Sequence, residues 1–180
     1  GREEEKREGK EKKREIAPAK SSFTRYLQSF PNGAFSLNAH YYLCVIGKEQ
    51  KDEAAVLEHA GKLLEYPDNP YSQEALIARA EILFNRKQFD QALNDYRQLK
   101  AKATTPERRQ LAETGMLRSA ALMQDDVETI AAATDLLAET KLTPELRNEI
   151  VEKGQGDAII PFLQGLTQEE RKTLVPCLNK

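Results

Sequence analysis

The sequence predicts an all-α protein of antiparallel helix hairpins, and three observations support this fold class. The composition is that of a helical protein, because Trp is absent and Leu, Ala, Glu, Lys, Arg and Gln are abundant. Between residues 21 and 150, apolar residues recur at spacings of three and four rather than two, which is the periodicity of an amphipathic helix. Several segments resemble one another after about 36 residues, as in a repeat protein.

Composition also excludes several classes of protein. Hydrophobic residues make up 39% of the 180, and no apolar stretch approaches the roughly 20 residues that a membrane-spanning helix needs. The 27 basic and 29 acidic residues give a net charge of -2, so no general basic field points to nucleic acid. Cys44 and Cys177 form no CxxC pattern, so neither a disulfide scaffold nor a zinc site is indicated.

Residues 1–16 are expected to be a charged tail, either disordered or a solvated helix. Apart from Gly1 and Gly9, every residue of positions 1–15 is charged, and Glu3 with Arg7 has the helical i,i+4 spacing. The segment lacks an apolar face that would hold it against a core, and no apolar region of a signal peptide follows it. The functional alternative is a charged arm for a partner. Gly1 in place of Met suggests a piece excised from a larger multi-repeat protein.

Polar caps and prolines mark the expected helix starts. Ser72 follows the breaker Asp68-Asn69-Pro70 and precedes an apolar run. Thr105-Pro106-Glu107 and Thr143-Pro144-Glu145 each place a capping hydroxyl before a proline at the first helical position. These signals predict helices of 10–17 residues joined by short links, which is a hairpin architecture.

The internal repeat is clearest at an offset of 36 residues. Residues 27–39 match residues 63–75 at Leu27/Leu63, Phe30/Tyr66, Pro31/Pro67, Phe35/Tyr71, Ser36/Ser72 and Ala39/Ala75. The same offset relates Leu63 to Leu99. A third copy follows at a slightly longer period, because Thr105-Pro106-Glu107 recurs after 38 residues and Arg79-Ala80 is matched by Arg118-Ser119 after 39.

These residues resemble the tetratricopeptide repeat, a helix-turn-helix unit of about 34 residues with small side chains where its two helices cross. The best copy runs from Leu76 to Pro106, and Ala80 and Ala92 occupy its small positions. The third copy is expected to use Ser119 and Ala131 there. The resemblance implies a right-handed superhelix of antiparallel hairpins, an α–α solenoid. It implies that eight side chains are buried between helices: Cys44, Val56, Ala60, Leu63, Ala80, Ala92, Tyr96 and Leu99.

The sequence departs from the family pattern at three positions. His40 and Leu76 stand where an aromatic is usual, and Gly47 replaces a large residue. The turn Phe30–Ser36 and its echo at 66–72 are similar to the 36-residue subclass of the repeat. That subclass occurs in outer-membrane assembly lipoproteins and TolA-binding coordinator proteins, which suggests a periplasmic or bacterial cell-envelope location.

Three regions are therefore expected. Residues 1–16 are the charged tail, and residues 17–153 hold about three and a half repeats. Residues 154–180 do not match the repeat and are expected to form a helical cap or the start of another helical module.

The sequence contains no recognisable arrangement of catalytic residues. His40 and His59 have no carboxylate at the spacing of a zinc site. Cys44 is expected to be a buried, inert thiol. Asp125-Asp126 is expected to cap a helix, and Arg108-Arg109 to lie on a solvated helix face. We therefore expect a protein that is not an enzyme and that uses no metal or cofactor.

The expected function is a scaffold that binds a peptide or helix of a partner protein. In the family the first helix of each hairpin lines a concave groove, and that pattern selects eight residues here: Asn38, Tyr41, Val45, Glu49, Glu74, Ile77, Glu81 and Asn85. The three glutamates favour a basic partner. We expect a monomer or weak oligomer without nucleic acid or a membrane span. The alternatives are a nucleic-acid-binding helical repeat and an enzyme with a non-sequential site.

Overall fold

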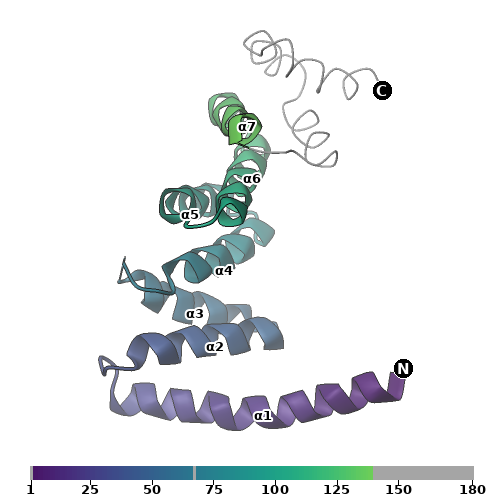
Figure 1. Cartoon of the computed structure of the whole chain (residues 1–180), viewed down its shortest axis with the longest axis vertical. Helices are drawn as coiled ribbons and strands as arrows, with labels where there is room; N and C mark the ends of the chain where they lie inside the picture. The colour runs from purple at the N-terminus through teal and green to yellow at the C-terminus, as the bar shows by residue number, and fades with distance from the viewer. Residues whose placement is uncertain (1, 67, 140–180) are drawn as a thin grey trace. The chain divides into compact units, whose positions relative to one another are not determined.

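The computed structural model describes residues 2–66 and 68–139, and the side chains of residues 15–66, 68–133, 135 and 136. This part of the chain contains helices and turns but no strand, which confirms the all-α fold class. The expected Thr143 helix start, Cys177 and the expected cap at 154–180 lie outside the described residues. The helices (Figure 1) are α1 (Arg2–Ser29), α2 (Ser36–Gln50), α3 (Glu53–Leu64), α4 (Ser72–Asn85), α5 (Phe89–Lys102), α6 (Pro106–Leu122) and α7 (Asp126–Glu139).

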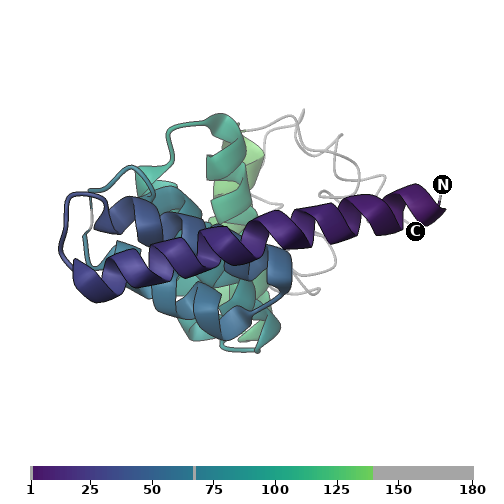
Figure 2. The same ribbon diagram turned by 90° about the horizontal axis from the view of Figure 1, so that it is seen from below.

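The chain divides into two compact units, residues 1–82 and 83–180, and the division falls near the end of α4. In the first unit α1 packs on α2, and α2 packs on α3. Helix α1 crosses the boundary expected after residue 16 without a break, and its N-terminal part extends past the end of α2 (Figures 1 and 2).

Small residues allow α2, α3 and the start of α4 to approach closely. The core of the first unit is a cluster of buried residues: Cys44, Val56, Ala60, Leu63, Ala75 and Ala78. At Gly47 a Cβ atom would lie 3.0 Å from Val56 Cγ2 and 3.3 Å from Val56 N. Gly47 therefore replaces a large residue because α2 and α3 meet at this point.

The expected 36-residue repeat recurs in the backbone before α2 and before α4. Ser36 N donates to Gly33 O, and Ser72 N donates to Asn69 O. The two serine hydroxyls donate to the same carbonyls at 2.8 and 3.0 Å. Both serines are buried, so this turn is a packed feature of each copy.

A second turn recurs three times, between α2 and α3, before α5, and between α6 and α7. Its central residue has a positive φ: 55° at Lys51, 61° at Lys87 and 58° at Gln124. Each of these N–H groups donates to the carbonyl three residues earlier, and the following N–H donates to the carbonyl five residues before itself. The turn residues are 36 and 37 positions apart, so this turn recurs at nearly the period of the expected repeat.

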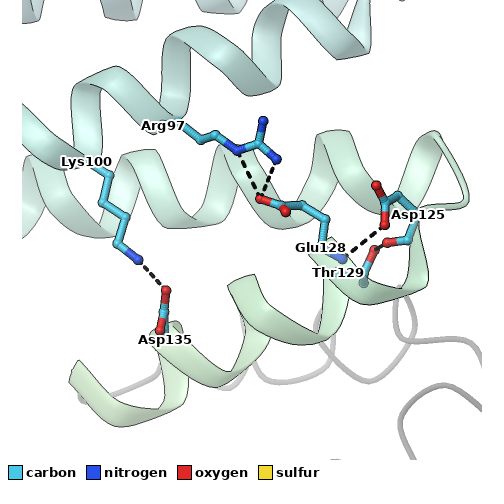
Figure 3. Close-up of polar contacts among 6 residues, drawn as sticks. All are labelled: Arg97, Lys100, Asp125, Glu128, Thr129 and Asp135. Carbon is cyan, nitrogen blue, oxygen red and sulfur yellow. Dashed lines mark hydrogen bonds and ion pairs between the residues drawn. The ribbon is translucent and has the colours of Figure 1, made fainter.

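In the second unit α6 packs on both α5 and α7. Helices α5 and α6 approach closely at Gly115 of α6, where a Cβ atom would lie 2.5 Å from three ring atoms of Tyr96. Side chains of α5 and α7 also form ion pairs (Figure 3). Arg97 Nη2 lies 2.9 Å from Glu128 Oε1, and Lys100 pairs with Asp135.

Burial confirms the core residues of the first two copies and corrects those of the third. All eight side chains expected between helices are buried. In the third copy Ser119 is buried, but Ala131 is exposed, so the expected register is wrong there. The equivalents of Ala80 and Ala92, counted from the turn residue, are Leu117 and Thr129, which are 0% and 3% exposed. The expected register is thus two residues too far along the chain.

Enlarging a small core residue is expected to destabilise the protein. Ala80 and Ala92 are 0% exposed, so Ala80→Leu and Ala92→Phe should each lower the free energy of unfolding by about 1–3 kcal/mol through overpacking. Chemical denaturation measures this effect. The matched control is Ala131→Leu, because the exposed Ala131 has room for a larger side chain. If Ala131→Leu were the most damaging of the three, the corrected register would fail.

Candidate functional site

The candidate site is the face of α2 that meets the start of α4. Four of the residues expected to bind a partner lie on α2 at spacings of three and four: Asn38, Tyr41, Val45 and Glu49. Asn38 and Tyr41 are half-buried, whereas Val45 and Glu49 are exposed. Helical spacing therefore places these four side chains in one row.

Tyr71, just before α4, ties that helix to α2. The Asn38 amide Nδ2 donates to the Tyr71 hydroxyl at 2.7 Å. The rings of Tyr41 and Tyr71 are stacked, with centroids 4.3 Å apart and 13° between their planes. Farther along, Lys48 Nζ lies 3.6 Å from Glu81 Oε2. Sequence reasoning selected Asn38, Tyr41 and Glu81 but missed that they join the two helices.

The stack continues across α2 to α1. Tyr41 meets Tyr42 edge to face at 5.4 Å, and Tyr42 stacks on Phe23 of α1 at 5.2 Å and 13°. Four rings thus form a continuous row over α1, α2 and the start of α4; we call Phe23, Tyr42, Tyr41 and Tyr71 the aromatic row. Tyr42 is 47% exposed, and Val45 beside it is 38% exposed. Sequence reasoning missed Phe23 and Tyr42 because neither falls on the expected groove positions.

The remaining expected residues belong to α4. Glu74 and Ile77 are half-buried, while Glu81 is exposed. Asn85 is exposed and belongs to the second unit. In the first unit, Asn38 and Tyr41 therefore meet at Tyr71, whereas Glu81 pairs with Lys48 farther along α2.

A pocket of about 340 Å³ lies elsewhere in the first unit, between the end of α1, the start of α2 and the end of α3. Its polar lining includes His40 of α2 and the Lys62–Glu65 ion pair, whose atoms are 2.9 Å apart. The hydrogen bond to Glu65 raises the pKa of Lys62. The exposed Phe30 and Phe35 belong to the turn between α1 and α2, which also supplies apolar residues to the lining of this pocket.

His40 and His59 meet beside this pocket. Their Nδ1 atoms are 3.0 Å apart, and their ring centroids are 5.2 Å apart. Burial is the main cause that lowers the pKa of each imidazole. The spacing of 19 residues gave no hint of this contact, which depends on the pairing of α2 with α3.

Other chemistry-bearing residues have structural surroundings. Burial raises the pKa of the Cys44 thiol, and Asp125 Oδ1 accepts from Glu128 N at 3.0 Å as expected for a cap. Arg109 is exposed, as expected for a solvated helix face, and its Nε also lies 3.4 Å from Oε1 of Glu113, a fully buried carboxylate. Within the described residues, no group of three or more potential metal ligands occurs. Of the helices in this part of the chain, none is long and apolar enough to cross a membrane.

Comparison with known proteins gives no match to a family model, a curated protein or a solved structure.

Proposed function

We propose that the chain is a non-catalytic protein-binding repeat that takes a peptide or helix of a partner on the face of α2 and α4. The observation that carries this proposal is the aromatic row, which joins α1, α2 and the start of α4 into one surface. Aromatic side chains supply large contact areas at protein interfaces with little loss of side-chain entropy. The exposed Tyr42 and Val45 provide the apolar centre that such an interface needs.

Charge beside the row favours a basic partner. Glu49 and Glu81 place two carboxylates near the C-terminal end of α2, with Lys48 as the adjacent cation. Acidic groups at the rim of an interface raise the rate of association with a Lys- or Arg-containing segment more than they raise its affinity. We therefore expect binding that weakens as salt is added.

The resemblance to the tetratricopeptide repeat supports the proposal. The two kinds of turn that recur at intervals of 36 and 37 residues agree with a repeated hairpin. We propose that the hairpins form the right-handed superhelix of that family, with α2 and α4 as first helices of successive repeats. The 36-residue subclass adds the proposal of a bacterial cell-envelope location.

A displayed library of random peptides tests the function and does not require the natural partner. Peptides selected on the whole chain should be enriched in Lys or Arg and in apolar anchors. Val45→Arg should weaken their binding at least about tenfold, because it places bulk and positive charge beside the aromatic row. Titration calorimetry or fluorescence anisotropy measures the change.

The matched control is Val127→Arg on α7, since Val127 is 81% exposed and lies in the other unit. It should leave peptide affinity unchanged. Equal binding by the two variants would move the site away from α2. Tighter binding of single-stranded RNA or DNA than of any selected peptide would instead favour the nucleic-acid class, because exposed aromatics also stack on bases.

A further inference from the structure

The α2–α3 hairpin contains a contact between the only two histidines of the sequence. His40 belongs to α2 and His59 to α3, and the 3.0 Å between their Nδ1 atoms is a hydrogen-bond distance. The rings are tilted by 41°. Both imidazoles are partly buried, so this contact is part of the packing between the helices.

The contact depends on the number of protons in the pair. A bond between two Nδ1 atoms needs one proton between them: one ring donates and the other accepts. Neutral rings satisfy this requirement, and so does a pair that holds one extra proton on the far nitrogen of the donor. A second extra proton leaves two N–H groups directed at each other on two adjacent cations.

We propose that the His40–His59 contact is an acid-sensitive joint, which holds α2 against α3 when the pair carries at most one extra proton and is broken when both imidazoles are charged. The joint follows from geometry alone and does not depend on the partner-binding function. It places a conformational response to mild acid in the hairpin that carries Tyr41 and Tyr42 of the aromatic row.

The charged side chains around the pair act in opposite directions on the pKa values of His40 and His59, and both pKa values stay lowered. Lys62 of α3 and Lys20 of α1 disfavour the imidazolium forms of His40 and His59, respectively. Glu58 favours both charged forms, Glu65 favours that of His40, and Asp52 favours that of His59. Burial is the largest cause for both rings, so the pKa of each lies below the ordinary value of 6.5.

Because both pKa values are lowered in the folded protein, the sign of the pH dependence of its stability follows. As the pH falls through about 6.5, histidines of the unfolded chain take up protons that the folded pair resists. The contribution of the histidine pair to the free energy of unfolding is therefore fully present above this pH. It decreases as the pH falls toward the lowered pKa values of the folded protein. The two protons of such a coupled pair bind in separate steps.

Titration of the whole chain tests the joint, because both histidine signals in an NMR spectrum belong to this pair. With a chelator present to exclude metal ions, the rings should titrate in two coupled steps, the second more than about one pH unit below the first. In His59→Gln, the remaining His40 should titrate in one step closer to 6.5. Two independent single-step curves near 6.5 in the unmodified chain would overturn the proposal.

Thermal melting followed by circular dichroism provides the second measurement. Between pH 7.5 and pH 5.0 the unmodified chain should lose about 3 °C or more in melting temperature relative to His40→Gln/His59→Gln. Carboxylates and the terminal amine are the same in both proteins, so the difference isolates the histidines. An equal pH slope in the two proteins would contradict the joint. If the double variant does not fold, the NMR titration of the unmodified chain still decides the question.

Discussion

Gly115→Val is expected to lower the free energy of unfolding by about 3 kcal/mol, at the upper end of overpacking effects. Any Cβ atom at this position would lie 2.5 Å from Cδ1, Cε1 and Cζ of Tyr96. Tyr96 is itself only 6% exposed, so its ring cannot swing into solvent without opening the contact between α5 and α6. Urea denaturation of the purified variant measures the loss.

Two further variants separate the clash from the general effect of glycine in a helix. Gly61→Ala in α3 should stabilise the protein by about 1 kcal/mol, because the added Cβ meets nothing within 4 Å beyond its adjacent residues and its own helix backbone, and alanine is the better helix former. Gly115→Ala should be much less harmful in a Tyr96→Leu background, where the ring is absent. If Gly115→Val melts like the parent, α5 and α6 do not pack as described.

Truncation of the buried leucine that follows each hairpin turn is expected to be the other large effect. Leu63, Leu99 and Leu136 each lie twelve residues after a turn residue of positive φ, and each is 0% exposed. Leucine-to-alanine changes at such positions cost about 2–5 kcal/mol, because they remove buried apolar surface and leave a cavity. Chemical denaturation of the three variants should therefore give losses of similar size.

The control for this series is Leu111→Ala, since Leu111 is 38% exposed on α6. Its loss should stay below about 1 kcal/mol. A neutral Leu136→Ala beside costly Leu63→Ala and Leu99→Ala would show that the third hairpin does not pack like the first two.

Much of the fold could be predicted because the first two copies share residue types at a fixed offset. The pairs Ser36/Ser72 and Ala39/Ala75 are buried in both copies, and Leu63 and Leu99 occupy the same register. These side chains are buried at matching positions of the two copies, so the pattern of similar residue types is visible in the sequence.

The register of the third copy could not be predicted by the same means. Helix ends of this kind commonly have glycine at the positive-φ position, but this chain has Lys51, Lys87 and Gln124 there, so the turns carry no glycine signal. The run 131–133 consists of three alanines, among which size cannot identify the buried position. Thr129, the equivalent of Ala92, is polar, so the expectation of a small apolar residue at the crossing does not select it.

The candidate site was predicted only in part, because its main features are contacts between helices. The resemblance to the tetratricopeptide repeat selected Asn38, Tyr41 and Val45, which lie on one face of α2. The stacking of Tyr41 on Tyr71 and of Tyr42 on Phe23 depends on how α1, α2 and α4 pack. The contact between His40 and His59 has the same origin, because 19 residues of sequence separate the two rings.

The most direct test of the proposed function is an NMR titration of the whole chain with a peptide selected from the library. Addition of the peptide should perturb the signals of Val45 and Tyr42 first and most strongly, and leave Val127 on α7 unchanged. Such a result would place the ligand on the aromatic row of the first unit. Perturbations centred on α6 and α7, with Val45 and Tyr42 unaffected, would contradict a binding site on α2.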